Sequence, residues 1–342
     1  MIDILSFAIK DFRDTFIKAM NQDAVSFKSQ FILESLVKKD PGFTYNLAHD
    51  NNNKVTGIVW MTSYMRDNFE RFGNYLSIDV MHSSICNSKE FCYIAPVVKN
   101  EIDKINVVCE GFVYSETNDA YIFVLESLFQ MCPNRVKENV YAIFSDEFMT
   151  NSILDSIGMS DTYIFYDHYH LKINLEKSLL KKWNVLKPFI DAMFVAKSEI
   201  TLIALHKQAC SICEESNSCV LILLKLMEKK KHWAPYLIDE VKGTFGLRGS
   251  SLSESNHASV KKFVLEYTDG MHGAMYELMM RQKKLMLTNH ELICHEYLQM
   301  NIIKQSHSPQ GTHSNIFLFQ ASNFLCVKGF NIIKKSYINS QK

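Results

Sequence analysis

Apolar runs separated by short polar turns dominate the chain between residues 43 and 114. The first of them, FTYNLAHDNNNKVTGIVWMT, places two strand-like runs around an Asp-Asn-Asn-Asn turn, which predicts a β-hairpin. Three further runs follow, NYLSIDV, FCYIAPVV and INVVCEGFVY. Because short polar turns join them, they are expected to pair antiparallel as a three-strand meander.

Beyond Tyr114 the hydrophobic spacing alternates between the period of a helix and that of a strand. Helical spacing predicts helices over 118–131, 147–157 and 171 to about 183, and the segments NVYAIFS and TYIFYDHYH between them predict strands. The order β-β-β-α-β-α-β-α predicts a mixed α/β sheet, a meander followed by parallel strands with right-handed helical crossovers. This is the element order of a ribonuclease-H-like domain.

From about 184 to 246 the pattern becomes helical, and Met, Leu and Lys dominate, which predicts an all-helical insertion. The chain is therefore expected to divide into an N-terminal helical and hairpin segment (1–70), the first part of a ribonuclease-H-like core (71–183), the insertion (184–246), the core helix with a further acid (247–290) and a divergent C-terminal tail (291–342).

Charge and cysteine usage narrow the class of protein. Among 342 residues, Lys+Arg and Asp+Glu are equal at 37 each, so any binding to nucleic acid must use local patches rather than bulk charge. Nine cysteines at irregular spacings favour free thiols in a reducing compartment. The first residues lack a basic region, and no apolar run approaches the ~18 residues of a membrane-spanning helix, so a soluble intracellular protein is expected.

Three acids stand where metal chemistry would need them. Asp79 ends the first meander strand and Asp146 ends the strand NVYAIFS, so parallel pairing of these strands would bring both carboxylates to one sheet edge. Glu254 opens a later helix and is the third candidate. Such carboxylates suit Mg²⁺ or Mn²⁺, and two ions ~4 Å apart can activate the attacking oxygen and stabilise the leaving oxygen in phosphodiester displacement.

Each acid also has a purely structural interpretation. Asp79 and Asp146 are residues that commonly form turns at strand ends. Ser251 and Glu254 fit the capping box S-x-x-E, in which the glutamate only caps its own helix. The spacing of Glu254 alone favours the cap, whereas the three acids together on this element order favour a metal site.

Six stretches of the chain, in order, resemble blocks of the transposases of Mutator-like elements, the group that also gave rise to the far-red-response transcription factors of plants. They cover roughly residues 35–275 and are DPGFTYNLAHDNNNKVTGIVWMT, FGNYLSIDVMHSSICNSKEFCYIAPVV, GFVYSETNDAYIFVLESL, IFSDEF, YDHYHLKINLEKSL and HWAPYLIDEVKGTFGLRGSSLSESNHASVKKF.

The resemblance implies a DDE-type DNA transposase core that uses two Mg²⁺ or Mn²⁺ ions per site. It implies metal-dependent cleavage at element ends, attack of the freed 3′-hydroxyl on target DNA without a covalent enzyme intermediate, double-stranded DNA as partner, a homo-oligomer and a nuclear location. The implied catalytic and metal-binding residues are Asp79, Asp146 and Glu254, with His170, Asp167 and Asn256 in support. Candidates for DNA contact, chosen because lysines adjoin a tryptophan or follow the third acid, are Trp233, Lys229, Lys230, Lys261 and Lys262.

The chain departs from the family pattern at several places. Asp79-Val80-Met81 replaces Asp-x-Thr, and Asp167 replaces the cysteine of C-x-x-H, which makes Asp167 an additional acid near the site. The sequence has no N-terminal zinc finger and no C-x-C…C-x-H cluster near its C-terminus, which fits a truncated copy or a catalytic core without its end-reading domain. Two alternative functions stay open: a domesticated, catalytically silent DNA-binding regulator, and a stand-alone nuclease of the same fold.

Overall fold

The computed structural model describes residues 33–34, 36–38, 40–82, 91–213, 217–240, 251–264, 270–307, 331 and 334. The chain divides into two compact units. One comprises residues 1–98 and 107–274, and the other comprises residues 99–106 and 275–342. Most of the predicted N-terminal helical segment lies outside the described residues, as do positions 241–250 between the helical segment and Ser251.

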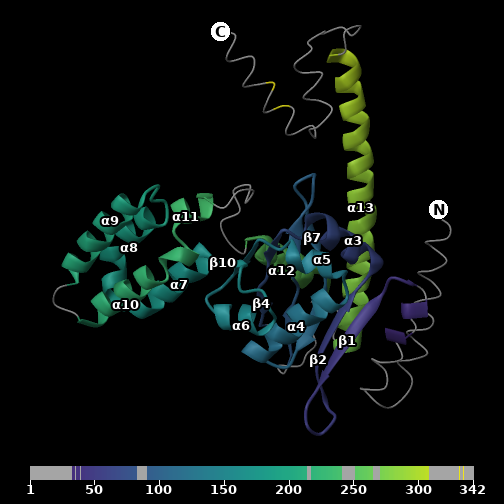
Figure 1. Cartoon of the computed structure of the whole chain (residues 1–342), viewed down its shortest axis with the longest axis horizontal. Helices are drawn as coiled ribbons and strands as arrows, with labels where there is room; N and C mark the ends of the chain where they lie inside the picture. The colour runs from purple at the N-terminus through teal and green to yellow at the C-terminus, as the bar shows by residue number, and fades with distance from the viewer. Residues whose placement is uncertain are drawn as a thin grey trace. The chain divides into compact units, whose positions relative to one another are not determined.

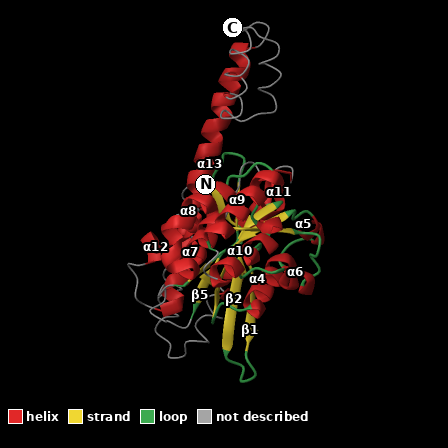
Figure 2. Ribbon diagram, turned by 90° about the vertical axis from the view of Figure 1, so that its left-hand side faces the viewer, coloured by secondary structure: helices red, strands yellow, loops and turns green. Residues whose placement is uncertain are grey.

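The predicted hairpin is confirmed. Strands β1 (Thr44–His49) and β2 (Val55–Met61) pair antiparallel, and in the turn between them Asp50 Oδ1 accepts hydrogen bonds from the backbone N–H groups of Asn52 and Lys54. Figure 2 shows these two strands side by side. Strand β2 continues the sheet by pairing with β8 (Glu110–Val113), followed by β5 (Cys92–Ile94) and β4 (Val80–Met81). The hairpin therefore extends the meander rather than standing apart from it.

A second run of strands carries the parallel part of the structure. Its order is β10 (Tyr163–Tyr166), β9 (Ala142–Ser145), β3 (Tyr75–Ser77), β6 (Val97–Lys99) and β7 (Ile105–Val107). β3 and β10 both pair parallel with β9, whereas β3 pairs antiparallel with β6. The predicted mixed sheet is confirmed, including the parallel alignment of the strands that precede Asp79 and Asp146.

The sequence predicted three continuous meander strands. In the structure each of them is interrupted. NYLSIDV forms β3 and β4, FCYIAPVV forms β5 and β6, and INVVCEGFVY forms β7 and β8. At one interruption Pro96 has no N–H to donate, and its carbonyl accepts from Val108 N at 3.0 Å. At another, the Asp79 side chain accepts the N–H of Val80 at 2.9 Å. Asp79 thus lies at a break between two strands.

Helices follow the strands much as expected, with shifted ends. They are α3 (Ser63–Phe72), α4 (Asn118–Gln130), α5 (Asn134–Glu138), α6 (Asn151–Ser156) and α7 (His168–Leu179). The prediction that TYIFYDHYH is a strand throughout was wrong. β10 ends at Tyr166 because the Asp167 carboxylate accepts the N–H groups of Tyr169 and His170, at 2.5 and 3.2 Å, and so caps α7.

The segment after α7 is helical wherever the structure describes it. It contains η1 (Leu180–Lys182), α8 (Trp183–Met193), α9 (Glu199–Ile212), α10 (Asn217–Glu228), η2 (Lys230–His232) and α11 (Pro235–Glu240). Figure 1 shows α8 to α11 gathered beside α7. Its all-helical character agrees with the sequence pattern, and its status as an insertion into the core stays a prediction.

Aromatic side chains join this helical segment to the parallel strands. Phe144 of β9 and Phe165 of β10 are buried with ring centroids 5.4 Å apart, and Ile238 of α11 packs in the same cluster. Burying an apolar side chain of this size contributes roughly 1.5–3 kcal/mol. The ends of β9 and β10, where Asp146 and Asp167 follow, are therefore held on a rigid core.

Two long helices complete the described chain. Helix α12 (Ser251–Val264) carries Glu254 in its first turn. Helix α13 (Gly270–His307) leads into the second unit, in which Asn289 Nδ2 donates to Asn106 Oδ1 at 2.7 Å. Both of these asparagines are buried, so this amide pair ties α13 to the segment 99–106.

Candidate metal centre

Asp79 lies at the break between β3 and β4 and is 8% exposed. Its Oδ1 accepts from Val80 N, and its Oδ2 lies 3.6 Å from Nδ1 of His257. Burial raises the pKa of Asp79 to about 6; His170 lowers it, and Asp146 and Glu116 raise it. The raised pKa means that the surroundings of Asp79 solvate its negative charge poorly.

Asp146 follows β9 directly, and β9 runs parallel to β3. Its Oδ1 accepts the N–H of Phe148 at 3.0 Å, which fixes the carboxylate. Its pKa is raised, first by burial and next by the charge of Glu116, with His170 acting in the opposite direction. The parallel register brings Asp146 close enough to Asp79 for its charge to raise the pKa of Asp79.

A second group of ligand atoms gathers around His170. One ligand atom each from Asp167, His170 and Glu254 lies within 4.8 Å of the others, and His170 Nε2 is 3.8 Å from Glu254 Oε1. The pKa of Glu254 is raised by burial and by Asp167 and lowered by His170. Among the His, Cys, Asp and Glu side chains of the described ranges, these three form the group whose ligand atoms lie close enough together to bind one metal ion.

His170 connects the two groups. Its charge lowers the pKa of Asp79 and Asp146 on one side and of Glu254 on the other. The acids that the sequence predicted to converge therefore share one imidazole as neighbour. Asp167, which the sequence marked as a departure from C-x-x-H, lies in the same group and caps α7 as well.

Helix α12 is anchored to the sheet on the turn that carries Glu254. Ser253 Oγ and Ser77 Oγ, both buried, are 2.9 Å apart, which ties α12 to the last residue of β3. One turn on, His257 reaches Asp79, and its ring meets the edge of the buried Tyr93 at a centroid distance of 6.1 Å. Asn256 is also buried. These contacts hold the turn of α12 that carries Glu254 against the end of β3.

The capping-box interpretation of Glu254 depends on Ser251, whose side chain is outside the described residues. In the structure the Glu254 carboxylate lies near His170 and Asp167.

Sequence reasoning missed three side chains of this region, Glu116, His82 and His257. Glu116 precedes Thr117, the N-cap of α4, and interacts with both Asp79 and Asp146. Its Oε2 is 2.5 Å from His82 Nε2, and its Oε1 accepts from Tyr121 at 2.9 Å. No strand-end pattern marks Glu116. Glu116 could have been found from its place shortly after β8, because β8 pairs with β5 and β5 pairs with β4.

The predicted DNA-contact residues fall into different environments. Trp233 is fully buried, and its indole N–H donates to Leu226 O at 2.8 Å, so the ring has no face left on which a base could stack. The expectation of base stacking by Trp233 is therefore corrected. Lys229 pairs with Glu147 at 2.8 Å, Lys230 pairs with Glu199, and Lys261 and Lys262 are exposed on α12.

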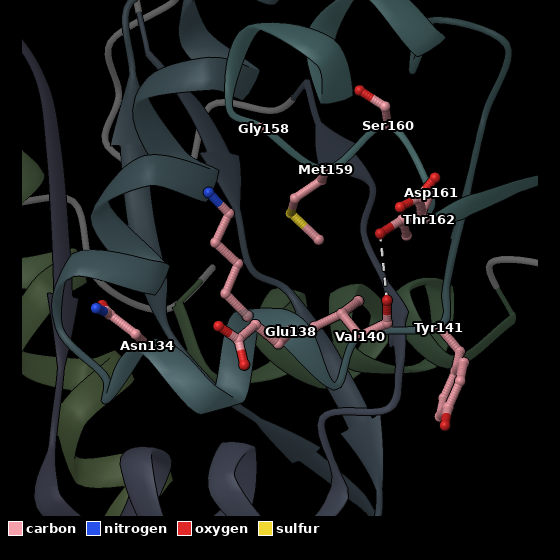
Figure 3. A pocket seen from close by; sticks show the side chains of 10 residues that line it. Asn134, Glu138, Val140, Tyr141, Gly158, Met159, Ser160, Asp161 and Thr162 are labelled. Carbon is pink, nitrogen blue, oxygen red and sulfur yellow. Dashed lines mark hydrogen bonds between the residues drawn. The ribbon is translucent and has the colours of Figure 1, made fainter.

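A pocket of about 680 Å³ lies elsewhere, at the beginning of β9 and β10 (Figure 3). Its lining includes Lys137, Tyr141 and Thr162, and the Thr162 hydroxyl donates to Val140 O at 3.2 Å. Because Asp146 and Asp167 follow the opposite ends of the same strands, this pocket is separate from the acidic groups.

The donor set fits a hard divalent cation. Carboxylate oxygens predominate, one imidazole is included, and thiolates are absent from the group of Asp167, His170 and Glu254. Oxygen-rich sets of this kind suit Mg²⁺ and Mn²⁺. The raised pKa values point the same way, because neighbouring negative charges are relieved by a cation.

Comparison with known proteins agrees with the observed topology. Residues 34–155 match the family described as zinc finger SWIM domain-containing protein 1/3, RNaseH-like domain. The chain therefore contains a ribonuclease-H-like domain, and the fold class predicted from the sequence is confirmed. A search of curated proteins gave no match. None of the helices in the described ranges combines the length and apolar character that crossing a bilayer requires.

Proposed function

We propose that this chain is a DDE-type DNA transposase core that cuts and joins phosphodiesters with divalent metal ions. The observation that carries the proposal is the approach of Glu254 to His170 and Asp167 at the sheet edge where Asp79 and Asp146 end parallel strands. The ribonuclease-H-like domain is a fold that commonly processes nucleic acids with such ions, which supports the same conclusion.

Each side chain has a role that follows from its place. Asp79, Asp146 and Glu254 would hold Mg²⁺ or Mn²⁺, which when bound polarises phosphate oxygens and lowers the pKa of water or a hydroxyl. Asp167 fixes the start of α7 and so positions His170. His170 favours the ionised state of the acids on both of its sides, which keeps them competent as ligands.

The partner that this chemistry requires is double-stranded DNA, as element ends and as target. The sequence resemblance further supports a homo-oligomer, because joining two ends needs two active sites in one complex. It also supports a nuclear location. Lys261 and Lys262 are exposed on the helix that carries Glu254, so they are placed to neutralise phosphates beside the acids.

The test is strand transfer with purified full-length protein. A duplex with a pre-cut 3′-hydroxyl end from the sequences that flank the coding region is incubated with a target plasmid and Mg²⁺ or Mn²⁺. Joining is expected with the wild-type protein, and Asp146→Asn is expected to lower its rate by about 1,000-fold, because a metal ligand supplies several kcal/mol of transition-state stabilisation.

Asp155→Asn is the matched control, since Asp155 is an exposed aspartate on α6 and has no place in the acidic groups. Equal joining by wild type and Asp146→Asn would remove Asp146 from the mechanism. Cleavage without joining would favour a stand-alone nuclease. DNA binding without either activity, in a protein that does not bind Mn²⁺, would favour the domesticated regulator.

A further inference from the structure

We propose that the pocket at the beginning of β9 and β10 binds an arginine side chain from a segment of a partner protein (Figure 3). The guanidinium pairs with the carboxylates of Glu138 and Asp161 and stacks on the ring of Tyr141. This inference is independent of the proposed function, because the pocket lies at the opposite ends of the strands from Asp146 and Asp167.

The pocket is preformed, because backbone hydrogen bonds fix the segments that line it. Tyr141 N donates to Asn74 O at 2.8 Å, and Tyr163 N donates to Tyr141 O at 2.9 Å. In the loop before β10, Met159 N donates to Leu154 O at 2.8 Å. The pocket volume of about 680 Å³ lies within the range of ordinary ligand sites, so a side chain can enter without rearrangement of the backbone.

The charges that line the pocket are complementary to a cation. Glu138 and Asp161 are both exposed, and neither forms an ion pair within the part of the chain that the structure describes. Lys137 also lines the pocket, but its ammonium group donates to Ile157 O and lies 5.9 Å from the ring centroid of Phe129. The two carboxylates therefore stay available for a cationic ligand.

An exposed aromatic surface adjoins the pocket. Tyr141 is 58% exposed, and its ring stacks on Tyr75 with centroids 6.2 Å apart and an interplanar angle of 26°. Tyr163 is exposed as well, and its ring stacks on Phe165. Tyr75 and Tyr163 both pair with Ala142 of β9, so they belong to one row of the sheet. Stacking holds the Tyr141 ring in place while most of the residue stays open to a cation.

These features together favour arginine over other ligands. A guanidinium is planar, so it can donate two parallel hydrogen bonds to a carboxylate and stack on an aromatic ring, which a lysine ammonium group cannot do. Bases of a nucleic acid could stack on the tyrosines, but Glu138 and Asp161 would repel the phosphates. The row of tyrosines offers the residues that flank the arginine an apolar surface with polar hydroxyl groups, as in protein interfaces. The partner is therefore a protein segment.

The test follows the methyl group of Met159, which lines the pocket, by NMR of the full-length protein with isotope-labelled methionine methyl groups. Met159→Leu assigns the signal. Short Gly-Ser peptides with one central Arg, Lys or Glu are titrated in a chelator and without DNA. The Arg peptide is expected to shift the Met159 signal saturably, the Lys peptide to bind about threefold more weakly, and the Glu peptide to cause no shift. The signal of Met65, which is buried on α3, should stay unchanged.

Substitutions then assign the contacts. Glu138→Gln together with Asp161→Asn is expected to weaken binding of the Arg peptide about tenfold, because two charge pairs are lost at about threefold each. Tyr141→Leu is expected to weaken it about threefold. The matched control is Glu126→Gln together with Asp155→Asn, which removes the same charge from exposed positions on α4 and α6 outside the pocket.

Several results would overturn the proposal. They are equal binding of the Arg and Glu peptides, no saturable shift with the Arg peptide, and equal weakening by the two double variants. A shift of the Met159 signal by single-stranded DNA and not by the Arg peptide would assign the pocket to nucleic acid instead. Because the peptides are compared on the wild-type protein, that comparison decides the question even where a variant folds poorly. None of these outcomes bears on strand transfer, which is tested at Asp146.

Discussion

The helical segment from Trp183 to Ile238 and the acidic edge of the strands both bury polar side chains, but they surround them differently. In the helical segment, the Trp233 indole donates to Leu226 O, and His232 Nδ1 donates to Ile164 O, each at 2.8 Å. Nearer the surface Lys230 pairs with Glu199. Donors there meet acceptors, and positive charges meet negative ones.

At the strand ends several carboxylates lie near one another, although His170 and His257 are also close to them. Asp79 is surrounded by Asp146 and Glu116, and Glu254 by Asp167, so that burial and repulsion raise the pKa of Asp79, Asp146 and Glu254. His170 compensates only in part. A fold that needed these side chains for stability alone would pair them with cations, as the helical segment does.

The difference separates residues that stabilise this protein from residues that make it function. Groups whose interactions are complete without a ligand, such as Trp233, should contribute to the free energy of unfolding. Groups whose interactions are completed only by a cation should reduce stability until the cation binds. Substitutions in the two regions are therefore expected to have effects of opposite sign.

The largest effect is expected at Trp233. Trp233→Ala removes a fully buried indole that packs on Phe194 at a centroid distance of 4.9 Å, and it should lower the free energy of unfolding by about 3–5 kcal/mol. Urea denaturation followed by circular dichroism measures this change. Leu221→Ala, at a position on α10 that is 57% exposed, is the control and should stay within about 0.5 kcal/mol. A loss below about 1 kcal/mol for Trp233→Ala would contradict the stabilising role of Trp233.

The second effect concerns affinity for DNA. Replacing both Lys261 and Lys262 by alanine should weaken binding to duplex DNA and reduce the slope of log affinity against log salt by about 2, one for each lost phosphate contact. The matched double variant Lys229→Ala with Lys230→Ala should change the slope less, because Glu147 and Glu199 already pair with these lysines. Fluorescence polarisation across a salt series measures the slope for each double variant. A larger change for the Lys229 and Lys230 variant would indicate that DNA binds to the helical segment instead.

These two regions also differ in what the sequence alone could predict. The spacing of hydrophobic residues was enough to predict the hairpin and the helix 118–130, because burial on one face leaves a repeating pattern. The resulting order of strands and helices was enough to predict the parallel pairing of β3 with β9. It was not enough for the breaks at Asp79 and Pro96. Those depend on a side chain that takes a backbone N–H and on a residue that lacks one, which hydropathy does not record.

The candidate site was predictable where an acid ends a strand and unpredictable where it does not. Asp79 and Asp146 were proposed from their strands and Glu254 from the start of its helix, whereas the resemblance suggested His170, and a departure from the family pattern suggested Asp167. Glu116 and His257 reach the same place from a loop before α4 and from one turn beyond Glu254. Such convergence is set by tertiary packing. Conversely, the tryptophan beside lysines at Trp233 suggested DNA stacking, although packing had already used both faces of the ring.

A smaller effect of opposite sign is expected at Asp146. Asp146→Asn keeps an oxygen for the Phe148 N–H and removes one of the repelling charges, so the metal-free protein should gain about 1 kcal/mol. Thermal melting in a chelator measures the gain. Addition of Mn²⁺ should then raise the melting temperature of wild type more than that of the variant, because only the complete set binds tightly. A lower melting temperature of Asp146→Asn in chelator would place Asp146 with the stabilising residues.

The smallest effect is a pH dependence within the helical segment. Burial lowers the pKa of His232 from its ordinary value of 6.5, and Lys231 and Lys229 add to the lowering, although the hydrogen bond to Ile164 O opposes it. Because the folded state disfavours the protonated ring, the contribution of His232 to stability is complete above pH 6.5 and is lost as the pH falls below that value.

His232→Asn keeps a donor for Ile164 O but cannot titrate, so urea midpoints measured at pH 7.5 and 5.5 should fall less in the variant than in wild type. The difference between the two proteins removes the contribution of all other titrating groups, including His206, whose pKa is also lowered by burial. An equal fall in both proteins would show that the ring is not confined to its neutral state by the fold. The helical segment would then resemble the acidic edge in tolerating a charge without its partner.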